Sequence, residues 1–218
     1  MNKQHKGILS DIVCITAFLI LTAMTVGSYF NDERMGYQIF TGIFTALFCL
    51  VPLLFRRKNI MTLPLLLVIM IELAIFLHGY GVLLLQYDNL AWYDSVTHTT
   101  SSVVAGLCVF YALLVVDRSD DKIFFGRNGI SIFIVLIMMA LSVYWEVFEL
   151  IVDVLTGTSM QYSPFDTMRD MMSNLLGGIL VALYVRWFLG KYPTYDVEKE
   201  FNIHPKLIGI AAHSNHEQ

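Results

Sequence analysis

The chain has 218 residues, of which 56% are hydrophobic and only 15% are charged, with a net charge of −4. A soluble domain carries about 25% charged residues, so the composition excludes an ordinary soluble globule. The balance of 14 Lys and Arg against 18 Asp and Glu also excludes a nucleic-acid binder that relies on basic patches. The composition indicates a membrane protein, with membrane lipid as its immediate partner.

Six hydrophobic segments follow one another along the chain, and crossing a bilayer takes about 20 residues. Leu, Ile, Met and Ala dominate them, which favours helices over strands. The segments are residues 12–30, 37–55, 60–85, 93–116, 130–152 and 165–189. We therefore predict an all-α fold, a polytopic membrane bundle of six transmembrane helices. Residues 1–190 are predicted to form one transmembrane domain, and residues 191–218 a polar cytoplasmic tail.

The basic residues predict the orientation of this bundle. With six spans, all of the 14 Lys and Arg residues except Arg34 and Arg169 fall on the side that holds both termini. Because cytoplasmic loops are enriched in Lys and Arg, we predict that both termini are cytoplasmic. We expect the protein in the cell membrane. The three cysteines, Cys14, Cys49 and Cys108, lie inside apolar segments and are predicted to be packing thiols.

Ionisable residues in the last four segments are the most informative feature of the sequence. An ionisable group within a span costs several kcal/mol and usually faces a partner or a water-filled cavity. One arginine, Arg169, stands near eight carboxylates and two histidines, which are Glu72, Asp88, Asp94, Glu146, Glu149, Asp153, Asp166, Asp170, His78 and His98. Since one arginine cannot neutralise eight carboxylates, we expect protons, water or a bound cation to compensate them.

Helical spacing groups these side chains into three polar stripes, because residues three, four or seven apart share one helix face. The stripes are Asp94 with His98; Glu146 with Glu149 and Asp153; and Asp166 with Asp170 and Asn174. The alternating direction of the spans brings all three to one depth, near the outer surface. Glu72 alone is expected near the midplane.

Carboxylates with one imidazole suit Zn²⁺, Mn²⁺ or Fe²⁺, and helical bundles hold such ions with ligands from facing helices. We therefore expect a divalent metal ion as cofactor, with Asp94, His98, Glu146 and Asp170 as its ligands. Either Glu149 or Asp166 would act as general base toward a metal-bound water. The other polar members of the site are Glu72, Asp153 and Asn174.

Structural interpretations of the same residues stay open. Asp94 and Asp166 stand where two segments begin, and Asp is a favoured helix N-cap. Glu72 is interpreted as a protonated carboxyl group bonded to a neighbouring helix, and Asp88 and Asp153 as surface loop residues. Gly177 and Gly178 are interpreted as a close-packing surface for another helix.

The residue pattern also resembles a known family. The YjdF-like multi-pass membrane proteins share the pattern Tyr93-Asp94-x-x-x-His98, Trp145-Glu146-x-x-Glu149 and Phe165-Asp166-Thr167-Met168-Arg169-Asp170-x-x-x-Asn174-x-x-Gly177. The pattern is more distantly similar to VanZ-like membrane proteins. The resemblance implies a six-helix fold and a shared polar site, and it implies no reaction. Where YjdF-like sequences tend to have a glycine after the histidine, this chain has Ser101-Ser102, which we expect to change the polarity of the helix.

Three functions are compatible with these residues. The first is a metal-dependent hydrolase or transferase that acts on a lipid-linked or amphipathic substrate at the extracytoplasmic face. The second is a proton- or cation-coupled transporter, in which Glu72 is the deeper station of the path. The third is a non-catalytic module that binds lipid or a partner protein, with the polar cluster locking the helices together. The sequence favours the enzyme, because the ligand-like residues gather at one depth and do not extend across the membrane.

Overall fold

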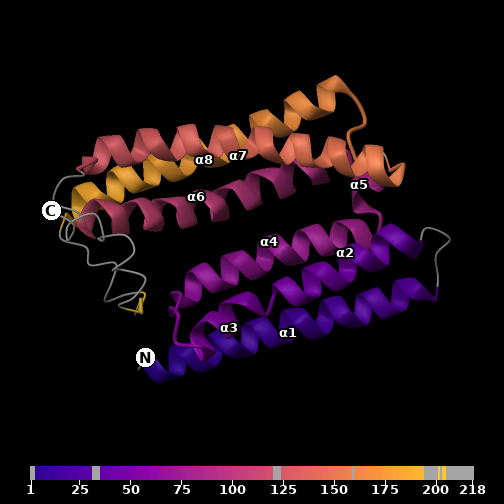
Figure 1. Cartoon of the computed structure of the whole chain (residues 1–218), viewed down its shortest axis with the longest axis horizontal. Helices are drawn as coiled ribbons and strands as arrows, with labels where there is room; N and C mark the ends of the chain where they lie inside the picture. The colour runs from indigo at the N-terminus through magenta and orange to yellow at the C-terminus, as the bar shows by residue number, and fades with distance from the viewer. Residues whose placement is uncertain are drawn as a thin grey trace, which may run out of the picture. The chain divides into compact units, whose positions relative to one another are not determined.

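The computed structural model describes residues 3–30, 35–119, 124–158, 160–193, 201 and 203–204. All secondary structure in these residues is α-helical (Figure 1). The helices are α1 (Lys3–Tyr29), α2 (Met35–Phe48), α3 (Val51–Arg57), α4 (Leu65–Leu83), α5 (Gln86–Asn89), α6 (Tyr93–Ser119), α7 (Gly126–Thr156) and α8 (Pro164–Lys191). The described residues contain six helical stretches long and apolar enough to cross a membrane. The prediction of an all-α protein with six spans is confirmed.

The chain divides into two compact units. The first comprises Met1–Tyr93 with Asp196–Gln218, and the second comprises Asp94–Tyr195. The predicted single domain of residues 1–190 stays a prediction. Of the predicted tail, residues 194–200, 202 and 205–218 lie outside the described part of the chain. Two described tail residues are hydrogen-bonded within the first unit. The Phe201 carbonyl accepts from the Thr62 amide at 2.7 Å, and the His204 amide donates to the Ile60 carbonyl at 2.9 Å.

In the first unit, α1, α2 and α4 pack against one another. Their shared core contains four buried side chains, Leu21, Ala46, Cys49 and Leu83. Gly79 allows α4 to approach closely, because a Cβ atom there would lie 2.8 Å from the Leu21 side chain. Cys14 and Cys49 are fully buried, as their predicted packing role requires. Cys108 is exposed, so the prediction of a packing thiol was wrong there.

The second predicted segment is two helices in the structure. Helix α2 ends at Phe48, and α3 begins at Val51 with Pro52 in its first turn. Proline has no amide hydrogen for the carbonyl four residues earlier, and its ring clashes with that carbonyl, which accounts for the interruption of the helix here. The prediction of a single helix over 37–55 was wrong at this point.

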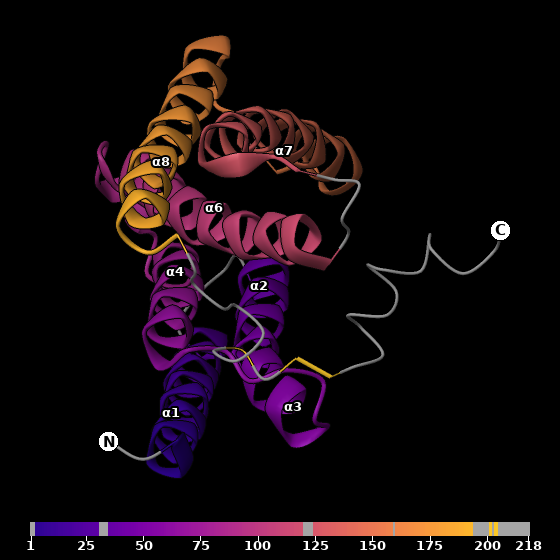
Figure 2. The ribbon, with the colours of Figure 1, turned by 90° about the vertical axis from the view of Figure 1, so that its left-hand side faces the viewer.

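In the second unit, α8 packs against both α6 and α7. A Cβ atom at Gly177 would lie 2.7 Å from the Ser102 Cβ of α6, and one at Gly178 would lie 3.0 Å from the Met138 Cβ of α7. Figure 2 shows these three helices next to one another. The predicted close-packing role of both glycines is confirmed.

The predicted orientation stays a prediction. Both termini were expected to be cytoplasmic on the strength of the basic residues, and no membrane is part of the structure. Four of the 14 Lys and Arg residues lie outside the described part of the chain, namely Arg34, Lys122, Lys199 and Lys206.

Candidate functional site

The predicted polar stripes of α6, α7 and α8 meet at one end of the second unit. Asp94 and His98 lie in the first two turns of α6, and Asp166 and Asp170 lie in the first two turns of α8. Helix α7 runs the opposite way, so its last turns, with Glu146 and Glu149, reach the same end (Figure 1).

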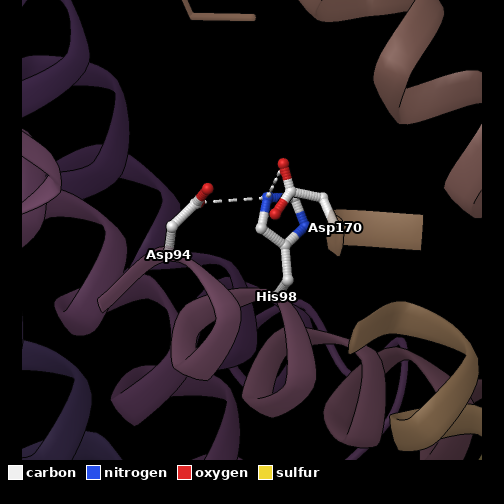
Figure 3. A group of neighbouring side chains, drawn as sticks. All are labelled: Asp94, His98 and Asp170. Atoms are coloured by element: carbon white, nitrogen blue, oxygen red, sulfur yellow. Dashed lines mark ion pairs between the residues drawn. The ribbon is translucent and has the colours of Figure 1, made fainter. Parts of the chain in front are cut away.

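Asp94, His98 and Asp170 form the centre of the site. The His98 Nε2 atom lies 3.3 Å from the Asp94 Oδ1 atom and 3.9 Å from the Asp170 Oδ2 atom (Figure 3). One ligand atom from each of the three residues lies within 4.8 Å of the other two. The side chains of His98 and Asp170 are 11% and 4% exposed. Among the described residues this is the group of metal-ligating side chains compact enough to hold an ion.

Arg169 neutralises part of the acidic charge from the more exposed side. Its guanidinium forms an ion pair with Asp94 at 3.1 Å and a close one with Asp166. Its Nε atom lies 3.8 Å from the Asp170 Oδ1 atom. Asp94 is therefore shared between an imidazole and a guanidinium, and a single arginine serves three carboxylates.

Glu146 and Glu149 of α7 are both buried. The Glu149 Oε1 atom accepts a hydrogen bond of 2.7 Å from the Trp145 indole. Gln161 donates to the Glu146 carbonyl oxygen at 2.9 Å and to its Oε2 atom at 3.3 Å. The Glu146 Oε1 atom is buried without a hydrogen-bond partner among the described residues. That these two carboxyl groups share a site with His98 stays a prediction, which rests on their position in the last turns of α7.

Asp166 helps to begin α8. The N-cap is Ser163, whose hydroxyl accepts from the Asp166 amide at 3.2 Å, and the Asp166 Oδ2 atom accepts from the Tyr162 amide at 3.3 Å. The interpretation of Asp166 as the N-cap was therefore wrong, since Ser163 is the N-cap and Asp166 lies three positions after it. Because its other oxygen pairs with Arg169, both oxygens are engaged.

Asn174 joins all three helices. Its Oδ1 atom accepts a hydrogen bond of 2.6 Å from the Ser102 hydroxyl of α6, and its Nδ2 group donates to the Ser142 hydroxyl of α7 at 2.9 Å. All three side chains are buried. Sequence reasoning missed Ser142, although it stands four residues before Glu146, on the same helix face. Ser102, from the Ser101-Ser102 pair noted in the sequence, is the polar partner of Asn174 on α6.

Asp153 organises the connection between α7 and α8. Its carboxylate accepts hydrogen bonds from the Thr158 hydroxyl and from the amides of Met160 and Gln161, at 2.7–2.9 Å. This loop carries the Gln161 side chain that contacts Glu146. Asp153 itself lies inside α7, so its interpretation as a surface loop residue was wrong, although its carboxylate holds the loop that carries Gln161.

Glu72 lies in α4 and belongs to the first unit, whereas the residues at the ends of α6, α7 and α8 belong to the second unit, apart from Tyr93 at the start of α6. Its side chain is buried. Neither carboxyl oxygen forms a hydrogen bond of ordinary geometry within the described residues. His78 is also in the first unit, where its Nδ1 atom lies 3.0 Å from the Tyr87 hydroxyl, and Asp88 lies in the short helix α5.

The matched family agrees with the membrane assignment. The model of a family described as predicted membrane proteins, DUF2238, matches residues 13–191. This range contains every residue of the site described above. No curated protein and no solved structure shows significant similarity to the chain.

Proposed function

The chain belongs to the DUF2238 family of predicted membrane proteins, and on this premise we propose that it is a metal-dependent hydrolase or transferase of the cell membrane. Its substrate is a lipid-linked or amphipathic molecule at the extracytoplasmic face. The observation that carries the proposal is the convergence of ligand atoms from Asp94, His98 and Asp170 to within 4.8 Å. The motif resemblance to YjdF-like and, more distantly, VanZ-like proteins belongs to the same proposal and adds no reaction to it.

The charges of the site favour a divalent cation. Three carboxylates, those of Asp94, Asp166 and Asp170, share one arginine, and α7 adds the buried Glu146 and Glu149. Uncompensated negative charge in a low-dielectric interior is costly, and two further positive charges reduce it. Glu146 lies outside the compact group of Asp94, His98 and Asp170, and we keep it as the proposed fourth ligand because its Oε1 atom is buried without a hydrogen-bond partner among the described residues. Oxygen ligands with one imidazole suit Zn²⁺, Mn²⁺ or Fe²⁺.

Glu149 is the better of the two predicted general bases. A metal ion in this site would supply a water of lowered pKa and a Lewis acid. Glu149 is buried and is oriented by one hydrogen bond, from Trp145. Asp166 has both oxygens engaged in the start of α8 and in the pair with Arg169. Glu149 therefore keeps the capacity to accept a proton.

The surface beside the site supports an amphipathic substrate. Three large apolar side chains at the start of α8 are strongly exposed, namely Tyr162, Phe165 and Met168. The Arg169 side chain is 43% exposed, so it can contact an anionic head group while it holds Asp94 and Asp166. Apolar and cationic side chains next to one another match a molecule with a lipid tail and an acidic head.

The metal content of the purified protein tests the proposed cofactor. Intact protein in lipid nanodiscs, after exposure to Zn²⁺ or Mn²⁺ and desalting, is expected to retain stoichiometric metal. The variants D94N, H98Q and D170N are expected to lose it, whereas D88N, which changes a carboxylate outside the site, retains it. Absence of metal from the wild type, or equal content in all variants, contradicts the proposal.

The reaction is tested with a variant of the base. We expect E149Q to keep the metal and to lose about 10²–10⁴-fold in turnover of lipid-linked esters or phosphate esters. Cation flux into proteoliposomes that is lost in E72Q, without turnover, would instead indicate the transporter. Unfolding of D94N and H98Q without any effect of metal or chelator on the wild type would indicate the non-catalytic module.

A further inference from the structure

Three basic side chains gather where α7 begins and α8 ends, at the end of the second unit opposite to the proposed metal site (Figure 1). They are Arg127 of α7 and Arg186 and Lys191 of α8. The Arg186 guanidinium donates to the Asn128 Oδ1 atom at 2.8 Å. A Cβ atom at Gly190 would lie 3.0 Å from the Arg127 Nη1 atom, so this guanidinium lies directly beside α8. Two contacts between the helices therefore bring the basic groups together.

The positive charge of this basic cluster is not compensated by an ion pair. Among the described residues, Arg127, Arg186 and Lys191 form no ion pair with a carboxylate. The Asp117 carboxylate, near the end of α6, instead accepts from two backbone amides at the start of α7, at 2.6 and 3.4 Å. All three basic side chains are exposed. Because guanidinium groups bind phosphate oxygens through paired N–H donors, the cluster suits a phosphate-bearing anion.

Aromatic rings surround the lysine of this cluster. The Lys191 Nζ atom lies 5.4 Å from the ring centroid of Trp187 and 5.4 Å from that of Tyr192, within the range of cation–π attraction. Both rings are exposed, Trp187 by 57% and Tyr192 by 45%. Trp and Tyr are enriched where a membrane meets water, at the level of the lipid head groups. A phosphate group bound beside Lys191 would therefore lie at the depth of a lipid head group.

An exposed apolar stripe leads from these rings along α8. Leu180, Leu183 and Trp187 stand at positions i, i+3 and i+7, so they share one helix face, and Lys191 follows one turn after Trp187. Both leucines are exposed. At 1.5 Å per residue the stripe from Leu180 to Lys191 is about 16 Å long, which is close to half of a hydrocarbon core of about 30 Å. The order of apolar, aromatic and basic side chains therefore matches one phospholipid in one leaflet.

From this arrangement we propose that Arg127, Arg186 and Lys191 bind the head group of an anionic phospholipid, whose acyl chain lies along Leu180 and Leu183. A soluble phosphate compound would use the basic side chains and leave the apolar stripe unused, so a lipid is the favoured occupant. The predicted orientation places this end of α8 at the cytoplasmic leaflet, which contains anionic lipids. The site is independent of the proposed function, because it shares no residue with the proposed metal site.

Fluorescence quenching by brominated lipids tests the proposal, because Trp187 lies within the site. The intact chain with the substitutions W92F and W145F keeps Trp187 as its single tryptophan. We reason that one basic side chain near anionic lipid strengthens binding about fivefold. In vesicles of phosphatidylcholine and phosphatidylglycerol, brominated phosphatidylglycerol is therefore expected to bind beside Trp187 about fivefold or more tightly than brominated phosphatidylcholine. The variant R127Q/R186Q/K191Q, in the same background, is expected to show no preference.

Two controls separate lipid binding from a structural role of the same residues. Arg57→Gln removes a basic side chain that is 64% exposed and is paired with Asp11 in the first unit, and it should keep the preference. Asn128→Ala removes the hydrogen bond with Arg186 without a change of charge, and it should also keep the preference. Absence of a preference in the parent chain, or an unchanged preference in R127Q/R186Q/K191Q, overturns the proposal. Loss of the preference in excess inorganic phosphate, at constant ionic strength, would overturn the assignment to a lipid.

A measurement on the wild-type chain covers the case in which the tryptophan or arginine variants do not fold. Native mass spectrometry is applied to protein in detergent that contains equal amounts of phosphatidylglycerol and phosphatidylcholine. We expect the retained lipid to be mainly phosphatidylglycerol, and the retention to fall as the salt concentration rises, because exposed charges are screened by salt. Equal retention of both lipids overturns the proposal. The result does not depend on bound metal or on turnover at the other end of α8.

Discussion

The hydrogen bonds of Asn174 are predicted to hold the three helices of the second unit in register. The substitution Asn174→Leu keeps the approximate size of the side chain and removes both interhelical bonds, the one of 2.6 Å with Ser102 and the one of 2.9 Å with Ser142. An interhelical hydrogen bond in a membrane protein contributes about 0.6 kcal/mol on average and up to about 1.7 kcal/mol. Two lost bonds therefore cost about 1–3 kcal/mol of unfolding free energy. We expect the lower half of this range, because both serine hydroxyls can turn to a carbonyl of their own helix.

Equilibrium unfolding in mixed detergent micelles measures this loss. Ser173→Ala is the matched control, since the Ser173 hydroxyl bonds to the Arg169 carbonyl within its own helix at 2.9 Å. That variant is expected to unfold within about 0.5 kcal/mol of the wild type. A double-mutant cycle of S102A and N174A should give a favourable coupling energy. An N174L protein as stable as S173A would refute the reasoning.

Three further predictions follow from the second unit and its control positions. Gly177→Ala places a Cβ atom 2.7 Å from the Ser102 Cβ atom, so thermal unfolding in detergent should show that the protein is less stable by about 1–3 kcal/mol. Gly27→Ala is the control, because a Cβ atom there meets open space, and it should be neutral or stabilising by up to about 1 kcal/mol. Equal effects of the two substitutions on stability would contradict the close packing at Gly177. Asp153→Ala should speed hydrogen exchange of the Met160 and Gln161 amides without changing helix content, and unchanged exchange would contradict the role of the Asp153 carboxylate. Arg169→Gln removes a positive charge beside the proposed metal ligands, so divalent metal should bind about tenfold more tightly, or about 1.4 kcal/mol; weaker binding in a titration would count against a cation site.

The fold could be predicted from the sequence because apolar segments of this length have few alternatives in a bilayer. The ends of the helices could not. Helix α1 begins at Lys3, whereas the hydrophobic segment begins at residue 12. Hydropathy indicates which residues lie in the membrane, and it does not indicate where the backbone hydrogen bonds of a helix begin. The break before Pro52 was also missed, although proline is a readable signal.

The grouping of the site residues could be predicted from helical spacing, because i, i+3 and i, i+4 positions share a face whatever the tertiary structure. Their partners could not, since these depend on how each helix is rotated toward its neighbours. The bond between Ser102 and Asn174 joins residues 72 positions apart. The ion pair of Arg169 with Asp94 likewise joins distant residues, which are 75 positions apart.

Anomalous X-ray diffraction from crystals of the intact protein soaked in Mn²⁺ tests the central claim most directly. A single strong anomalous peak within coordination distance of the Asp94, His98 and Asp170 side chains is the predicted result. Its loss in H98Q crystals of the same form would assign the peak to these ligands. A well-ordered map with no peak among these three side chains, under soaking conditions that load manganese elsewhere, would contradict the account.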